Sequence, residues 1–117
     1  KMIFFCSDND SRRSHWHAAL GDDGSNIRDL KSLNDLVQGL DTYSVGLVLF
    51  DLTMVELAQA EGLMLQYPAI YFFMMSSEPN PTEGIVLAKA GTRGYGNAWM
   101  HASVLNQAVA IVQAGDL

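Results

Sequence analysis

Unbroken apolar runs alternate along the chain with segments that mix apolar and polar residues. Val45–Phe50 and Ala69–Met75 hold apolar residues without alternation, a pattern typical of strands buried on both faces of a parallel sheet. The compact run Met2–Cys6 predicts a first strand of the same kind. Weaker patterns predict two short strands, near Asn26–Asp29 and at Arg93–Gly96.

The segments between these strands predict helices. The apolar positions after Ser32 recur at helical spacing, at Leu33, Leu36, Val37 and Leu40. Turn and stop signals separate the elements: Gly21 and Asp22-Asp23-Gly24-Ser25 after the first helix, and Gly91 after the fourth. The predicted helices cover Ser11–Leu20, the segment from Ser32, about Val55–Gln66, Thr82–Ala90 and His101–Ala114. In the last helix we expect one apolar face, made of Val104, Leu105, Ala108, Ile111 and Val112.

Five strand–helix units with short connections predict a single α/β domain, with a parallel sheet covered by helices on both sides. The length of 117 residues suits one hydrophobic core. No window approaches the roughly 18 apolar residues of a membrane span. The lone Cys6 fits a reducing compartment, so we expect a cytoplasmic protein without a membrane segment.

Charge argues against a nucleic-acid-binding surface on this domain. The net charge is −6, and phosphate binding needs a basic patch. The seven basic residues are scattered along the sequence, at Lys1, Arg12, Arg13, Arg28, Lys31, Lys89 and Arg93.

Carboxylates follow two of the predicted strands. Asp8 and Asp10 come after the first strand, Asp51 ends the third, and Ser76 follows the fourth. Because the carboxyl ends of parallel strands share one edge of the sheet, these groups are expected to meet there. Carboxylate oxygens are ligands that Mg²⁺ prefers. The alternative is that these aspartates only cap the helices that follow, since Asp is a favoured N-cap residue.

Four stretches together resemble the receiver domain of two-component response regulators, the CheY-like domain. They are FFCSDND, GLVLFDL, FFMMSS and, above all, AGTRGYGNA at 90–98. The last is similar to a segment common in receivers joined to helix-turn-helix transcription factors. The resemblance covers nearly the whole chain and implies a flavodoxin-like (βα)5 domain over residues 1–117, with strand order 2-1-3-4-5.

The resemblance also implies roles for individual residues. Asp51 matches the phosphoacceptor aspartate, and Asp8 matches a magnesium ligand. Mg²⁺ would then bind Asp8, Asp51 and the backbone carbonyl of Thr53. Ser76 matches the switch hydroxyl, and Tyr95 the switch aromatic of the fifth strand.

Two positions depart from the family pattern. Ser7 stands where receivers carry the first acid of a pair, and Ala98 stands where they carry a lysine. Phosphoryl transfer depends on cations that stabilise charge on the phosphoryl oxygens. These losses therefore predict an atypical receiver.

Three functions stay open. The first is a signalling receiver, not an enzyme, phosphorylated on Asp51 by a histidine kinase or phosphotransfer protein and controlling an attached output domain, possibly DNA-binding. The second is a pseudo-receiver that docks or dimerises without phosphorylation. In either case a homodimer is expected to form through residues 82–114. The third is a haloacid-dehalogenase-like phosphatase, with Asp8 as nucleophile, Asp10 as acid/base and Lys89 as its lysine.

Overall fold

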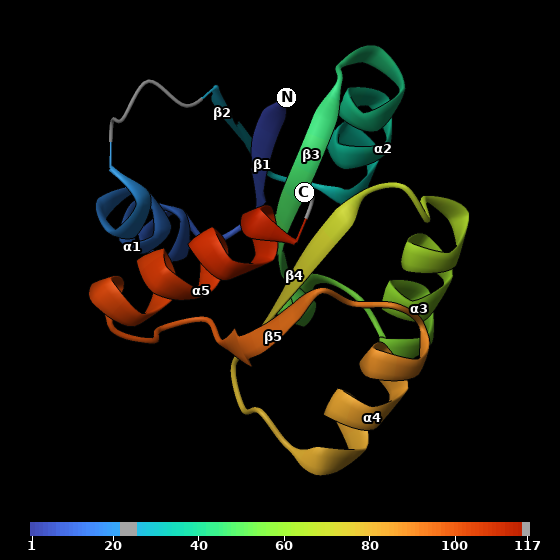
Figure 1. The fold of residues 1–117 in the computed structure, drawn as a ribbon. Helices are drawn as coiled ribbons and strands as arrows, with labels where there is room; N and C mark the ends of the chain where they lie inside the picture. Colours follow the sequence, from blue (N-terminus) through green and yellow to red (C-terminus); the bar gives the residue numbers. More distant parts are fainter. Residues whose placement is uncertain (22–25, 116–117) are drawn as a thin grey trace.

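Strands and helices alternate along the whole described chain (Figure 1). The computed structural model describes residues 1–21 and 26–115, so the predicted turn at Asp22-Asp23-Gly24-Ser25 lies outside the described residues. Within those residues no helix is both long and apolar enough to cross a membrane. The elements are β1 (Met2–Cys6), α1 (Asp10–Leu20), β2 (Ile27–Leu30), α2 (Leu33–Thr42), β3 (Val45–Asp51), a 3-10 turn η1 (Leu52–Met54), α3 (Leu57–Gln66), β4 (Tyr71–Ser76), α4 (Pro81–Lys89), β5 (Gly94–Asn97) and α5 (Ala102–Ala114).

The strands form one parallel five-stranded sheet in the order β2-β1-β3-β4-β5. Val48 in β3 pairs with Phe4 of β1 on one side and with Phe72 of β4 on the other. The flavodoxin-like fold and its strand order are therefore confirmed, and each predicted strand is present within two residues of its expected bounds.

Helices cover both faces of the sheet. In β3, Leu47 and Leu49 pack into a core beneath α1 and α5, whereas Val48 and Phe50 pack into a second core beneath α2, α3 and α4. Figure 1 shows α1 and α5 lying together on one side of the sheet. A strand with a core on each face needs apolar side chains at every position, which explains the unbroken apolar runs.

Polar side chains fix where three of the helices begin. Asn9 caps α1 by accepting a hydrogen bond from the Arg12 amide, at 3.0 Å. Ser32 caps α2 and Asn80 caps α4 in the same way. Each side chain satisfies a backbone N–H that has no partner inside the helix.

The third helix begins later than the sequence predicts. The 3-10 turn η1 follows β3, and α3 begins only at Leu57, where Glu56 and Gln59 form a reciprocal capping box. The alternative in which Asp51 caps the third helix is therefore wrong for that helix. Asp51 caps the short turn instead, through the backbone amide of Thr53.

The apolar face predicted for α5 is also wrong in part. Leu105 and Val109 are buried against α1 and the sheet, but Val104 is 53% exposed and Ile111 is 73% exposed. The apolar stripe of this helix is wider than the surface that the rest of the domain covers. Two of its apolar side chains therefore face solvent in the isolated chain.

Candidate functional site

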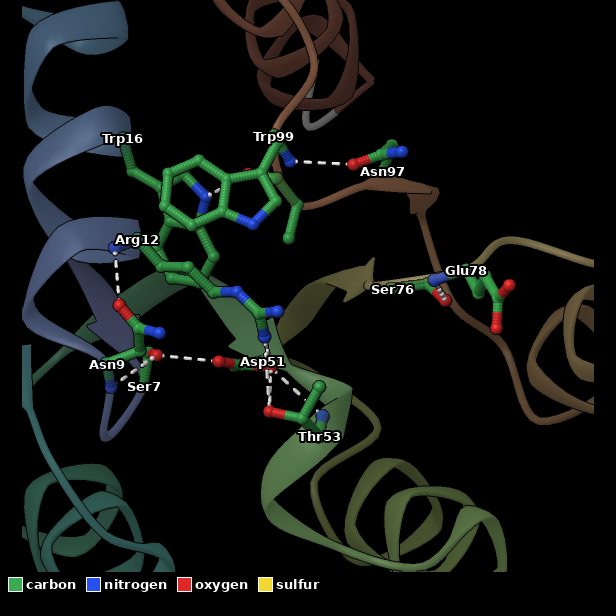
Figure 2. A network of polar contacts seen from close by, with 11 residues as sticks. Ser7, Asn9, Arg12, Trp16, Asp51, Thr53, Ser76, Glu78, Asn97 and Trp99 are labelled. Carbon is green, nitrogen blue, oxygen red and sulfur yellow. Dashed lines mark hydrogen bonds and ion pairs between the residues drawn. The ribbon is translucent and has the colours of Figure 1, made fainter.

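Three buried polar side chains lie at the carboxyl edge of the sheet, and two of them, Asp51 and Ser76, are among the groups that the sequence predicts there. Ser7 follows β1, Asp51 ends β3 and Ser76 ends β4. The side chains of Ser7 and Asp51 are hydrogen-bonded, with Oγ and Oδ2 2.7 Å apart. The Ser76 hydroxyl accepts a hydrogen bond from the Glu78 amide instead, at 3.1 Å (Figure 2).

The Asp51 carboxylate is fully buried, and donors from its own chain occupy both of its oxygens. Oδ2 accepts from the Ser7 hydroxyl. Oδ1 accepts from the Thr53 amide at 2.9 Å, from the Thr53 hydroxyl at 2.7 Å and from Nη1 of Arg12 at 2.7 Å. A buried carboxylate is stable only when it is paired and hydrogen-bonded, and these contacts meet that requirement.

Arg12 is the functional residue that the sequence reasoning missed. It lies in the first turn of α1, and Figure 2 shows its side chain reaching from that helix to Asp51 and Thr53. Only 12% of this side chain is exposed. A cation near a helix N-terminus is opposed by the helix dipole, so an arginine there signals a nearby anionic partner.

The environment keeps the Asp51 carboxyl ionised. Burial by itself raises its pKa, because desolvation disfavours the charged form. The hydrogen bonds from Ser7, Thr53 and Arg12 outweigh that effect and hold the pKa below the ordinary value of 3.8. Asp51 and Arg12 therefore form an ion pair at neutral pH.

Of the two carboxylates expected to bind Mg²⁺, Asp51 is buried and Asp8 is exposed. Asp10, the other acid after β1, pairs with Arg13, which also contacts Asp29. The described part of the chain contains no group of three His, Cys, Asp or Glu side chains that could hold a metal ion. Arg12 already places a cation on Asp51, so the donor set fits a guanidinium better than a divalent ion.

Ala98 has a structural place in the site but no side chain that could reach Asp51. Ala98 is buried, and its amide donates to the Ser76 carbonyl at 2.8 Å. Its own carbonyl accepts from the indole N–H of Trp16 at 2.9 Å. The residue therefore joins α1 to the segment after β5, while the positive charge at Asp51 comes from Arg12 of α1.

Tyr95 lies against the N-terminal end of α4. Its hydroxyl donates to the Glu83 carboxylate at 2.6 Å and accepts from the Asn80 amide at 3.0 Å. Burial and the hydrogen bond to Glu83 raise the pKa of Tyr95 above 10.0. The ring packs beside Gly84, where a Cβ atom would lie 3.2 Å from it.

The site lends no support to the phosphatase hypothesis. Lys89 is exposed at the end of α4, and a helix that follows a parallel strand ends at the edge opposite the carboxyl ends. Asp10 forms its ion pair with Arg13, within its own helix. Asp8, Asp10 and Lys89 are therefore not arranged as one catalytic group.

Comparison with known proteins identifies the fold. No protein-family model and no curated protein matches the sequence. Among solved structures, a response regulator from Thermotoga maritima has a TM-score of 0.86 at 18% identity, over 97% of both chains. The non-phosphorylated receiver domain of the stress response regulator RcsB from Escherichia coli has a TM-score of 0.86 at 14% identity, over 98% of this chain and 95% of that one.

A third structure is RcsB from Salmonella enterica serovar Typhimurium, bound to the promoter rprA in the presence of the phosphomimetic BeF3-. It has a TM-score of 0.82 at 13% identity, and the match covers 95% of this chain and 67% of that one. Identities this low support a statement about fold only. The chain has the fold of the response-regulator receiver domains, the CheY-like fold.

Proposed function

We propose that this domain is a signal-transduction receiver module with an atypical site, which works by docking and dimerisation without phosphorylation of Asp51. The observation that carries the proposal is the closed state of the Asp51 carboxylate. Its two oxygens accept four hydrogen bonds from Ser7, Thr53 and Arg12.

Phosphorylation would require a free Asp51 oxygen to attack phosphorus. Oδ1 is held by three donors, one of them a guanidinium, and this lowers its nucleophilicity. Oδ2 is held by Ser7, at the position where the resemblance implies a second acid. Whichever oxygen attacks phosphorus must first lose a donor.

Receiver domains typically use Mg²⁺, which would neutralise charge on the phosphoryl oxygens. The residues of this site fit such an ion poorly, since Arg12 occupies Oδ1 and Asp8 is exposed. We therefore propose that Arg12 takes the place of the divalent ion as the cation at Asp51.

The second candidate is a phosphorylated receiver. It is supported by the buried Ser76 at the end of β4 and by Tyr95 on β5, the two positions that resemble the switch pair. In that case Arg12 would stabilise a phosphoryl group on Asp51, and a histidine kinase or phosphotransfer protein would supply the group.

The proposed partners follow from the likeness to receiver domains. The likeness to the promoter-bound RcsB supports a DNA-binding output domain attached to the domain described here. The likeness to receiver domains supports action in the cytoplasm. Four exposed large apolar side chains within residues 82–114 support homodimerisation, namely Ile85, Trp99, Val104 and Ile111. Charged substitutions test this best at Val104 and Ile111 by light scattering, because Leu105 and Val109 are buried and their replacement would disrupt the core.

Incubation with acetyl phosphate and Mg²⁺, followed by intact mass measurement, separates the two candidates. The proposal predicts no phosphoryl adduct on the unmodified chain, under conditions in which a phosphorylatable receiver is modified. An adduct that forms on the unmodified chain and is lost in Asp51→Asn would establish the second candidate instead.

A further inference from the structure

We infer that Arg12 is a latch between Asp51 and Trp99, so that a change at Asp51 is transmitted to the surface beside α1 and α5. The inference deepens the proposed function and rests on it. It names the path by which a module without phosphorylation could connect its buried carboxylate to a partner. Because coupling between two sites is reciprocal, a partner that binds Trp99 would also change how Asp51 is held.

The first link is the ion pair. Nη1 of Arg12 donates to Oδ1 of Asp51 at 2.7 Å and to the Thr53 hydroxyl at 3.1 Å. Asp51 has no solvent exposure, so loss or repositioning of its charge cannot be compensated by water. The guanidinium must then move or find another partner.

The second link is a cation–aromatic contact. The Arg12 guanidinium carbon lies 5.8 Å from the centre of the Trp99 ring, and the His15 ring lies 5.5 Å from the same indole. Figure 2 shows Arg12 passing beside this indole on its way to Asp51. Nε of Arg12 is buried and has no hydrogen-bond partner among residues 1–21 and 26–115. The guanidinium therefore depends on Asp51, Thr53 and stacking for its position.

The backbone that carries Trp99 is clamped to α1. Trp16 donates its indole N–H to the Ala98 carbonyl, and His15 Nε2 donates to the Met100 carbonyl at 2.6 Å. The Trp99 amide is held by the Asn97 side chain at 2.8 Å. With residues 98–100 fixed, a movement of Arg12 acts on the Trp99 side chain, which is 46% exposed.

The pair that resembles the receiver switch has no such direct link. The Ser76 hydroxyl is engaged by Glu78, and the Tyr95 hydroxyl by Asn80 and Glu83. In the described ranges neither hydroxyl is hydrogen-bonded to Asp51. Thr53 also links Asp51 to solvent, but the contact that leads from Asp51 to Trp99 is the one made by Arg12.

Spectra of the two indole N–H groups test the latch on the 117-residue chain, with neither phosphodonor nor Mg²⁺ present. Asp51→Asn is expected to displace the Trp99 resonance in the unmodified background and to leave it in place in the Arg12→Met background. Arg28→Met is the matched control, because Arg28 contacts the Tyr43 ring and not Trp99. In the Arg28→Met background, Asp51→Asn should still displace the Trp99 resonance. The same displacement in the Arg12→Met background, or none in either, would overturn the inference.

A surface variant keeps the test independent of changes to buried residues. Trp99→Leu is expected to speed solvent exchange of the Arg12 Nε–H and to leave that of the Arg13 Nε–H unchanged. Arg13 Nε is also buried and has no hydrogen-bond partner in the described part of the chain, but Arg13 pairs with Asp10 and Asp29 and not with Asp51. Unchanged exchange at Arg12 contradicts the latch. Phosphorylation of Asp51 with acetyl phosphate would refute the proposed function while leaving these two results intact, so the two ideas fail separately.

Discussion

Nη1 of Arg12 lies 2.7 Å from Oδ1 of Asp51, and this ion pair supplies the positive charge at the carboxyl edge of the sheet. The charge comes from α1, on the side of the site opposite to Ser76 (Figure 2). A chain with the receiver fold that carries Ser7 and Ala98 thus keeps its buried aspartate ionised with its own arginine.

Replacing Arg12 leaves a buried carboxylate without its counter-ion. We expect Arg12→Met to lower the free energy of unfolding by about 2–4 kcal/mol at neutral pH, because breaking a buried ion pair strands the remaining charge. Urea unfolding measures the effect. Arg28→Met, which removes an exposed cation–aromatic contact with Tyr43, should cost less than about 1 kcal/mol.

A double-mutant cycle with Asp51→Asn isolates the pair. In the Asp51→Asn background, Arg12→Met should lower the free energy of unfolding much less than in the unmodified chain, because the buried negative charge is gone. An equal loss of unfolding free energy in both backgrounds would show that Arg12 stabilises the domain by packing and not by its charge.

Acid should weaken the domain through Asp51. The folded-state pKa of this carboxyl lies below the ordinary value of 3.8. The carboxyl therefore contributes fully to the free energy of unfolding above pH 3.8, and this contribution is lost as the pH falls through the folded-state pKa. The stability difference between the unmodified chain and Asp51→Asn should therefore be constant from neutral pH to about pH 5 and shrink at lower pH. A difference that grows on acidification would mean that Asp51 is protonated in the folded state.

Glu83 should control the ionisation of Tyr95. Burial and the 2.6 Å hydrogen bond to this carboxylate both raise the pKa of Tyr95 above 10.0. Glu83→Gln is expected to bring the pKa of Tyr95 down toward, but not to, 10.0, as followed by its ring resonances during a pH titration. Glu78→Gln, which leaves the Tyr95 contact intact, should have no such effect.

Two glycines should respond to alanine in opposite directions. A Cβ atom at Gly94 would lie 2.5 Å from the buried ring of Phe73, so Gly94→Ala should destabilise the domain by about 1–3 kcal/mol. At Gly62, on the exposed side of α3, a Cβ atom meets nothing within 4 Å. Gly62→Ala should stabilise by roughly 0.5–1 kcal/mol through helix propensity. Thermal unfolding of the two variants checks both signs, and a stabilised Gly94→Ala would refute the packing described for β5.

The fold could be predicted from the sequence because its signals are local. Unbroken apolar runs mark strands with a core on each side, and capping residues such as Ser32 mark helix starts. The apolar run that ends in an aspartate correctly placed Asp51 at the end of β3. The start of the third helix was predicted wrongly because Asp51 caps the short turn η1. The buried face of α5 was predicted wrongly because its apolar stripe is wider than the surface that covers it.

The chemistry of the site was harder to predict because it depends on one long-range contact. Arg12 is separated from Asp51 by 39 positions, and nothing in its sequence neighbours distinguishes it from Arg13. One of these adjacent arginines pairs with Asp51, and the other with Asp10 and Asp29. Adjacent helical positions point in different directions, so only the orientation of α1 decides which arginine reaches the site.

In the proposed function, Arg12 closes Asp51 to phosphoryl chemistry. The most direct test of this role is a titration of the unmodified chain with beryllofluoride and Mg²⁺, followed by the amide resonances of Asp51, Ser76 and Tyr95. RcsB from Salmonella enterica, solved in the presence of that phosphomimetic, serves as the positive control. The account predicts no saturable shift of the three resonances at millimolar Mg²⁺. Saturable shifts of all three would contradict it and establish a receiver that accepts a phosphoryl group.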